Sequence, residues 1–182
     1  MRLLGRYAMA IVVLLLCTHT EDAQEAPRMS AVLVDELVRL YPDANEATPA
    51  PTRMDAPRGS FAAVHVLINH APVGENLTLR ATGADDLPLR WYRLLDVPVA
   101  FNTGLEGWTT ARKPNNDNPH VTRTAPFRTY DAYQPVSSPV EIKAATTALR
   151  AEFEVSAQAK PGKREVTLLV GAIELKFALH VH

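Results

Sequence analysis

Apolar and polar residues alternate with a period of two along the last third of the chain. The clearest run is residues 173–181, whose odd-numbered positions are all apolar: Ile173, Leu175, Phe177, Leu179 and Val181. The same alternation runs through residues 166–170 and 149–155. Successive side chains of a β-strand point to opposite faces, so a period of two indicates a strand with one face buried. Three such strands are predicted here.

Two glycine-containing dipeptides separate these strands. Gly171-Ala172 predicts a two-residue hairpin loop, because glycine readily adopts the positive φ that such a loop needs at its first position. Pro161-Gly162 predicts a turn into the strand at 166–170. The carboxyl-terminal part of the chain is therefore expected to be a series of antiparallel strands.

Strand patterns also occur upstream. Residues 60–69 place Val64, Val66 and Ile68 on one face, and 76–82 form a shorter strand. Residues 89–101 form a long strand rich in β-formers, with Trp91 in the core and Pro98 at an edge position or a bulge.

Three other segments are less regular. Residues 31–41 fit a helix and a strand almost equally well. Residues 42–58 contain four prolines and read as a linker-like loop, and 102–126 read as a long loop without periodicity. About seven short strands with at most one short helix predict an all-β fold, an antiparallel β-sandwich of immunoglobulin-like or jelly-roll-like type.

Composition narrows the possible functions. The 182 residues are 47% apolar and 21% charged, which is typical of a globular protein. A formal net charge of −1 gives no general attraction to nucleic acid or to an anionic membrane, so nucleic acid is not expected as a partner. A single cysteine excludes a disulfide scaffold and a multi-cysteine metal site.

The first 26 residues have the layout of a secretory signal. Arg2 and Arg6 precede an apolar run over residues 8–17, and a polar segment follows. Ten apolar residues are too few to cross a bilayer as a helix, so no stable membrane span is expected. Cys17 could also be read as a lipidation site. The sequence thus predicts a secreted or periplasmic protein with one β-sandwich domain over residues 27–182.

Candidate catalytic and metal-binding groups are few. His180 and His182 share a strand face but lack a third ligand in the sequence, so we expect them to face solvent. His65 and His70 do not share a face and are expected in packing or surface roles. Asp85-Asp86 suits a turn cap better than a catalytic pair. No nucleophile elbow or phosphate-binding glycine loop occurs. Neither a catalytic residue, a metal ligand nor a cofactor is predicted.

The long loop at 102–126 is the predicted recognition site. It contains an aromatic ring that can stack on a sugar and polar groups that can bind its hydroxyls: Trp108, Arg112, Asn115 and Asn116. Tryptophan and arginine also anchor protein interfaces, so a protein partner fits as well. In the competing interpretation Trp108 packs back onto the sandwich and only fastens the loop.

Several segments resemble a known family. They are Pro126–Val136, with an aspartate before a proline after a long loop, Ala148–Val155 and Ala159–Lys163, with the opening strands at Ala31–Asp35 and Ser60–Ile68. Together they are similar to the N-terminal β-sandwich of glycoside hydrolase family 123-type secreted proteins, without the catalytic barrel. In that family the catalytic carboxylates lie in the barrel that follows the sandwich.

The resemblance implies an accessory domain, and it favours a protein without enzyme activity over an enzyme. We expect a secreted, non-catalytic β-sandwich associated with carbohydrate-active enzymes, which binds a glycan or packs on a separately encoded catalytic domain. A protein-interaction module of the cell envelope is the main alternative. A small glycoside hydrolase is a weaker one, because the sequence shows no catalytic constellation.

Overall fold

The computed structural model describes residues 27–44, 52–102 and 123–182, and it is all-β as predicted. The strands, in chain order, are β1 Ser30–Asp35, β2 Arg53–Ala56, β3 Ser60–Asn69, β4 Asn76–Leu77, β5 Leu79–Thr82, β6 Leu89–Val99, β7 Phe127–Val136, β8 Val140–Glu141, β9 Thr147–Val155, β10 Gly162–Val170 and β11 Ile173–Val181. No helix occurs in these residues, and so none that could span a membrane.

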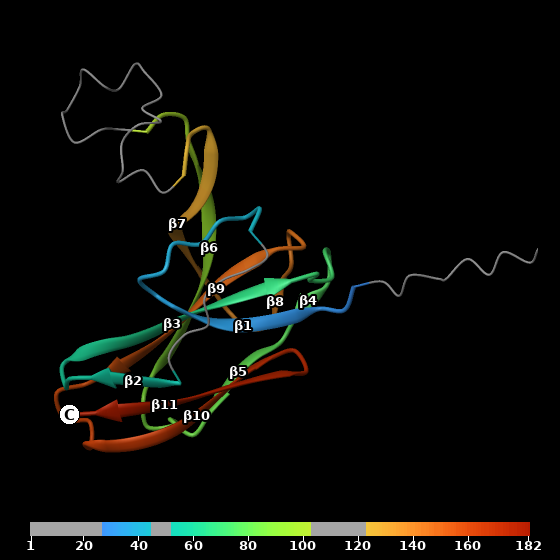
Figure 1. Ribbon diagram of the computed structural model, residues 1–182. Helices are drawn as coiled ribbons and strands as arrows, with labels where there is room; N and C mark the ends of the chain where they lie inside the picture. The colour runs from blue at the N-terminus through green and yellow to red at the C-terminus, as the bar shows by residue number, and fades with distance from the viewer. Residues whose placement is uncertain (1–26, 45–51, 103–122) are drawn as a thin grey trace, which may run out of the picture.

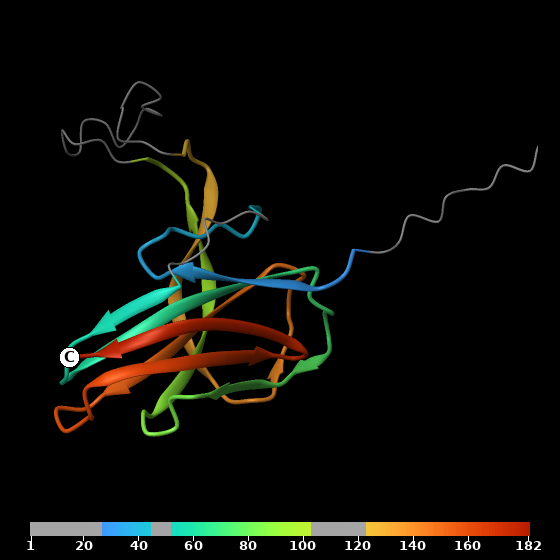
Figure 2. The ribbon, with the colours of Figure 1, turned by 60° about the horizontal axis from the view of Figure 1, so that its bottom comes forward.

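The strands form two main sheets. The five-stranded sheet has the order β1-β3-β9-β6-β7, and the four-stranded sheet has the order β2-β11-β10-β5. All pairings are antiparallel except that of β2 with β11. In Figure 1 the β10–β11 hairpin lies below β3 and β9, and Figure 2 shows β5 next to β10.

The core lies between the two sheets. Val64, Val66 and Ile68 of β3 are buried together with Phe153 of β9 and Phe177 of β11. The two phenylalanine rings meet edge to face across the sheets, with centroids 6.2 Å apart. Burial of these apolar side chains, at about 25 cal/mol for each Å² removed from water, is what holds the sheets together. Trp91 is also in this cluster, as its strand position predicts.

Most of the predicted strands are confirmed. The inward residues of β9, β10 and β11 are those given by the alternation, and β3 has the predicted limits. Gly171 has a φ of 61° at the first loop position of the β10–β11 hairpin. The turn before β10 is displaced from its predicted place: the amide of Ala159 donates to the carbonyl of Ser156, whereas Gly162 already belongs to β10.

Other segments correct the expectations. Residues 31–41 are a strand followed by a turn, since β1 pairs along its full length with β3. Arg53–Ala56, expected in a loop, is β2, which gains its hydrogen bonds from β11. The strand expected over 76–82 is divided into β4 and β5, which pair with different strands. β7 was not predicted as a strand.

The second half of β6 leaves the body of the sheet. β6 pairs with β9 only over Leu89–Arg93, whereas it pairs with β7 as far as Val99, with a bulge between Leu95 and Asp96. Bulges bend a strand and increase its twist. In Figure 1 the far ends of β6 and β7 accordingly extend together beyond the other strands. Pro98 lies in this part, where β7 is the only paired strand that the structure describes, so the predicted edge position is confirmed.

Candidate binding surfaces

The predicted recognition residues lie outside the described part of the chain. Trp108, Arg112, Asn115 and Asn116 all belong to residues 103–122, and the proposed signal belongs to residues 1–26. The described residues nevertheless carry two surfaces with a suitable chemistry. One is on the outer face of the five-stranded sheet, and the other is where β6 departs from β9.

The outer face of the five-stranded sheet is set by the pleat of β9. Phe153 points into the core, so its neighbours Glu152 and Glu154 point outward, as does Arg150. The register places His65 of β3 on one side of Arg150 and Tyr92 of β6 on the other. Directly paired residues share a face, so these side chains form one outward row across three strands.

Four of the outward side chains enclose an open hollow of about 400 Å³, which we call the tyrosine hollow: Tyr92, Tyr133, Arg150 and Glu152. The Tyr92 and Tyr133 rings are 6.3 Å apart and nearly perpendicular, at 73°. Tyr133 is 51% exposed, although a tyrosine ring is largely apolar. The hollow therefore presents aromatic surface to solvent beside charged groups.

Ion pairs and hydrogen bonds fix the polar wall of the hollow. The guanidinium of Arg150 binds Glu36 at 2.6 Å and Glu152 at 3.0 Å, and lies 5.3 Å from the centre of the Tyr133 ring. The Tyr92 hydroxyl donates to Glu152 Oε1 at 3.3 Å. Burial, the largest single effect, opposes the charged form of Arg150, but its hydrogen bonds to Glu36 and Glu152 and the negative charges of these residues together outweigh burial and raise the pKa of Arg150. Arg150 is thus held in place as a cation.

His65 is the buried member of this row. It is only 4% exposed, and its ring is 6.4 Å from that of Tyr133. Neither ring nitrogen makes a hydrogen bond to another described residue. Burial, and then the charge of Arg150, lower the pKa of His65 from 6.5 to about 4, against a smaller opposite effect of Asp35. The imidazole is consequently neutral at physiological pH.

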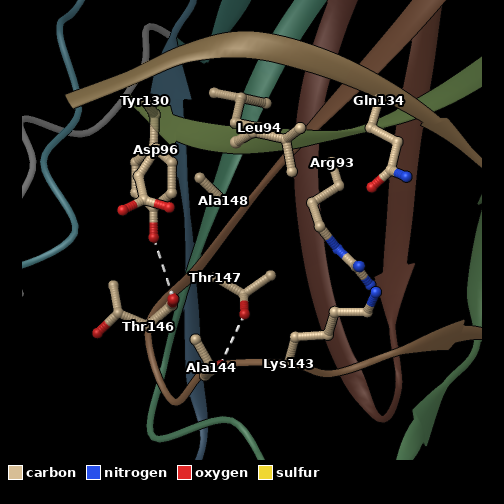
Figure 3. A pocket seen from close by; sticks show the side chains of 11 residues that line it. Arg93, Leu94, Asp96, Tyr130, Gln134, Lys143, Ala144, Thr146, Thr147 and Ala148 are labelled. Carbon is tan, nitrogen blue, oxygen red and sulfur yellow. Dashed lines mark hydrogen bonds between the residues drawn. The ribbon is translucent and has the colours of Figure 1, made fainter. Parts of the chain in front are cut away.

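The second surface is a cleft of about 280 Å³ that opens where β6 leaves β9 (Figure 3). It is lined by residues 93–96 of β6, Tyr130 and Gln134 of β7, and residues from 143–148. The Tyr130 hydroxyl donates to the carbonyl of Thr146 at 3.0 Å, and Thr147 Oγ1 donates to that of Ala144 at 2.7 Å. Burial, with a smaller contribution from Asp96, raises the pKa of Tyr130 to about 12. We refer to it as the β6–β9 cleft.

His180 and His182, which share a strand face, do not converge on a metal site in the described residues. His180 and His182 have ring centroids 6.5 Å apart, and His182 Nε2 lies 2.7 Å from Asp55 Oδ1. Within residues 27–44, 52–102 and 123–182, no group of three or more His, Cys, Asp or Glu side chains could hold a metal ion. His182 is therefore a partner of Asp55 on the neighbouring strand. His70 is exposed.

The predicted turn at Asp85-Asp86 is confirmed. Asp86 accepts two hydrogen bonds from Arg164 of β10, at 2.6 and 3.0 Å, which fastens the turn to the four-stranded sheet. The hydrogen bond from Arg164 lowers the pKa of Asp86, and those from Arg53 and then His182 lower that of Asp55 to about 2. A general acid needs a raised pKa, so these carboxyls do not suit that role.

Sequence reasoning missed both surfaces. The alternation over residues 149–155 implies that Arg150 and Glu152 face outward, and the strand expected over 89–101 includes Tyr92, but no local pattern connects the two strands. The missing information was the position of β7, which supplies Tyr133. The β-formers Thr129, Tyr130 and Tyr133 are a usable strand signal there. The bulge at Asp131, which has no partner residue on β6, interrupts the alternation that would otherwise indicate this strand.

Comparisons with known proteins give a distant likeness of fold. No protein-family model matches the chain, and no curated protein is similar to it in sequence. One solved structure with a similar fold is a family 123 glycoside hydrolase from Clostridium perfringens, described in a study of glycolipid glycan hydrolysis. The TM-score is 0.47 and the identity 13%, and the match covers 85% of this chain and 27% of that chain. No residue role is transferred from it.

Proposed function

We propose that this protein binds a saccharide, without cleaving it, in the tyrosine hollow. The observation that carries the proposal is the placement of a half-exposed tyrosine ring beside a fixed arginine–glutamate pair in an open hollow of about 400 Å³. Exposed aromatic rings are amphipathic and suit ligands that have both apolar and hydrogen-bonding surfaces. A sugar ring has C–H groups on one face and hydroxyls around its edge.

The polar groups of the hollow complement such a ligand. The Arg150 guanidinium supplies donors in a fixed plane, and the Tyr92 hydroxyl can donate or accept. Because Arg150 is already held by Glu36 and Glu152, little conformational freedom is lost when a ligand binds. A preorganised wall of this kind favours recognition of a defined pattern of hydroxyls.

The same geometry supports binding rather than hydrolysis. Glycosidases generally use two carboxyl groups on either side of the scissile bond. Among the described residues, Glu152 is the single carboxylate that lines the hollow. Its two oxygens already accept hydrogen bonds, Oε1 from Tyr92 and Oε2 from Arg150. Glu152 therefore acts in the proposal as an acceptor that positions its neighbours.

A protein partner is the second candidate, and exposed apolar side chains favour it. Leu37, just after β1, is 90% exposed, and Phe61 of β3 is 55% exposed. Large apolar side chains that are exposed in this way lose unfavourable contact with water when a protein partner covers them. In this version the domain packs on a separately encoded catalytic domain or on a cell-envelope protein.

We further propose that the protein is exported, as Arg2, Arg6 and the apolar run at 8–17 indicate. Mass spectrometry of the protein recovered from a secreting host should then show an amino terminus between about residues 18 and 27, since such signals are usually 15–30 residues long. Intact protein that begins at Met1 and stays in the cytoplasm would contradict export.

A glycan array followed by titration tests saccharide binding. The wild-type chain should bind a subset of glycans, and Tyr133→Ala should weaken binding of the best ligand by about 30-fold, the size of a hot-spot loss. Phe101→Ala is the matched control, because Phe101 is an exposed aromatic residue (68%) outside the hollow. Its affinity should equal that of the wild type.

The variant Trp108→Ala separates the hollow from the loop predicted by sequence. If Trp108→Ala abolishes binding and Tyr133→Ala does not, the recognition site lies in residues 102–126 and the hollow is not the site. If no glycan binds and Leu37→Ala prevents capture of a protein partner, the second candidate function is supported instead.

A further inference from the structure

Arg93 is a buried cation with no acidic partner among the described residues. The residue is 8% exposed, and its guanidinium donates one hydrogen bond, from Nη2 to the carbonyl oxygen of Glu141. Its Nε is buried and donates to no other described residue. Burying a charge is unfavourable unless it is paired and hydrogen-bonded. Arg93 therefore lacks, among the described residues, the counter-ion that would offset the burial of its charge.

A second cation faces the same cleft. Lys143, on the segment before β9, also has no ion-pair partner in the part of the chain that the structure describes. In Figure 3 the Arg93 and Lys143 side chains point toward one another. Like charges in this arrangement repel, and an anion between them would turn the repulsion into attraction.

The remaining polar groups of the β6–β9 cleft leave this end positively charged. Asp96 also lines the cleft, but it forms an ion pair with Arg128 and lies at the Tyr130 side in Figure 3. Gln134 is the cross-strand partner of Arg93, so it shares the arginine's face. Its amide adds a hydrogen-bond donor that carries no charge.

We propose that the Arg93–Lys143 end of the β6–β9 cleft binds an oxyanion, namely the carboxylate or sulfate group of a small molecule. The Arg93 guanidinium and the Lys143 ammonium would provide charge-assisted hydrogen bonds, which are the stronger kind. A volume of about 280 Å³ lies at the lower limit of ordinary ligand pockets, so one ring-sized molecule is accommodated.

This site is separate from the tyrosine hollow. Tyr92 and Arg93 are neighbours on β6, so their side chains point to opposite faces of the sheet. The hollow involves the outer face, whereas Arg93 lies on the side of Trp91 and the core. The proposal therefore does not depend on saccharide binding in the hollow, and either can fail alone.

A titration followed by two-dimensional NMR tests the proposal with three probes of similar size: glucuronate, glucose 6-sulfate and glucose. At least one of the two anions should bind saturably, and shifts should be largest for residues 93–96 and 143–148. Glucose should produce no comparable change there. Which anion binds more tightly tells whether the site takes a carboxylate or a sulfate ester. Added NaCl should weaken binding by screening the charges.

Substitutions then assign the site. Lys143→Gln should weaken anion binding by about tenfold, the effect of losing one hydrogen bond to a charged group. The matched control is Lys163→Gln, since Lys163 is an exposed lysine of β10 paired with Glu165. It should bind as the wild type does. Arg93→Lys keeps the charge but loses the planar donors, and it should also bind more weakly.

Three results would overturn the proposal. They are the absence of saturable binding by either anion, equal weakening in Lys143→Gln and Lys163→Gln, and shifts of equal size with glucose. Lys143 is exposed, so Lys143→Gln remains decisive even if Arg93→Lys does not fold.

Discussion

The two faces of the five-stranded sheet are built from neighbouring residues but are used differently. On β9, Phe153 and Val155 point into the core and are each 1% exposed. Arg150, Glu152 and Glu154 alternate with them and point outward, where they form ion pairs. The inner face is thus held by apolar packing, and the outer face by charge pairs beside aromatic rings.

The contrast is not uniform across the sheet. β3 is buried on both faces from Ala62 to Asn69, because its outward side is covered by a second apolar cluster. That cluster contains Val34, Leu40, Leu67, Leu94 and Ala148. The outer face therefore combines a buried apolar part, to which β6 and β9 contribute Leu94 and Ala148, with the accessible tyrosine hollow.

The largest effect is expected on the inner face. Phe153→Ala should lower the free energy of unfolding by about 3–5 kcal/mol, since it removes a buried ring that packs on Phe177. Chemical denaturation measures this loss. A loss below about 1 kcal/mol would mean that the two sheets are not packed through this pair.

The next largest effect is the pH dependence of stability that arises from His65, which is buried on the outer face. The pKa of His65 is about 4 in the folded chain, against 6.5 ordinarily, so between these values only the unfolded chain binds the proton. Stability should therefore decrease as the pH falls from about 6.5 to about 4, by at most about 3 kcal/mol. The groups around the ring are Arg150 of β9, Tyr133 of β7 and Asp35 of β1.

The control for this prediction is His65→Leu. It removes the titrating group, so the decrease in stability between pH 6.5 and pH 4 should be smaller than in the wild type. The lowered pKa of Asp55, about 2, acts below about pH 4 and so outside this window. Identical pH dependence in the two proteins would show that His65 is not the source.

A smaller effect is expected for the charge pairs beside the hollow. Arg150→Met keeps the apolar stem but leaves Glu36 and Glu152 unpaired, and it should destabilise the fold by about 1–2 kcal/mol. Arg128→Met is the control, because the pair of Arg128 with Asp96 is more exposed. Equal losses of stability in the two variants would mean that the partial burial of Arg150 does not strengthen its ion pairs.

The smallest effect on stability is expected at Glu154, the residue that directly follows Phe153 in the chain. Glu154→Ala removes an exposed ion pair with Arg90, at 2.9 Å, and should change stability by no more than about 0.5 kcal/mol. Thermal unfolding of Glu154→Ala beside Phe153→Ala compares adjacent positions on opposite faces. Similar losses at the two positions would contradict the assignment of the faces.

Periodicity predicted the inner face better than the outer one. A buried face leaves a repeating apolar signal, as in β9, β10 and β11, and that signal is local. β2 has no such signal, because four residues become a strand only through pairing with β11, which is more than 100 residues away. The tyrosine hollow is equally non-local. Tyr92, Tyr133 and Arg150 come together because the strands lie in the order β9-β6-β7. That order cannot be deduced from the hydrophobic pattern of the sequence.

The pairing of β2 with β11 has a consequence for how the chain folds. Ala56 lies beside Val181, and Ser60 lies beside Val155, so two of the sheet contacts close very long loops. Within residues 27–44, 52–102 and 123–182, only the β10–β11 hairpin joins paired strands separated by two residues. Folds with such distant pairings fold in milliseconds to seconds, more slowly than helical proteins of similar size. During synthesis β2 has no partner strand until β11 is made, so the four-stranded sheet cannot be completed before β11 is synthesised.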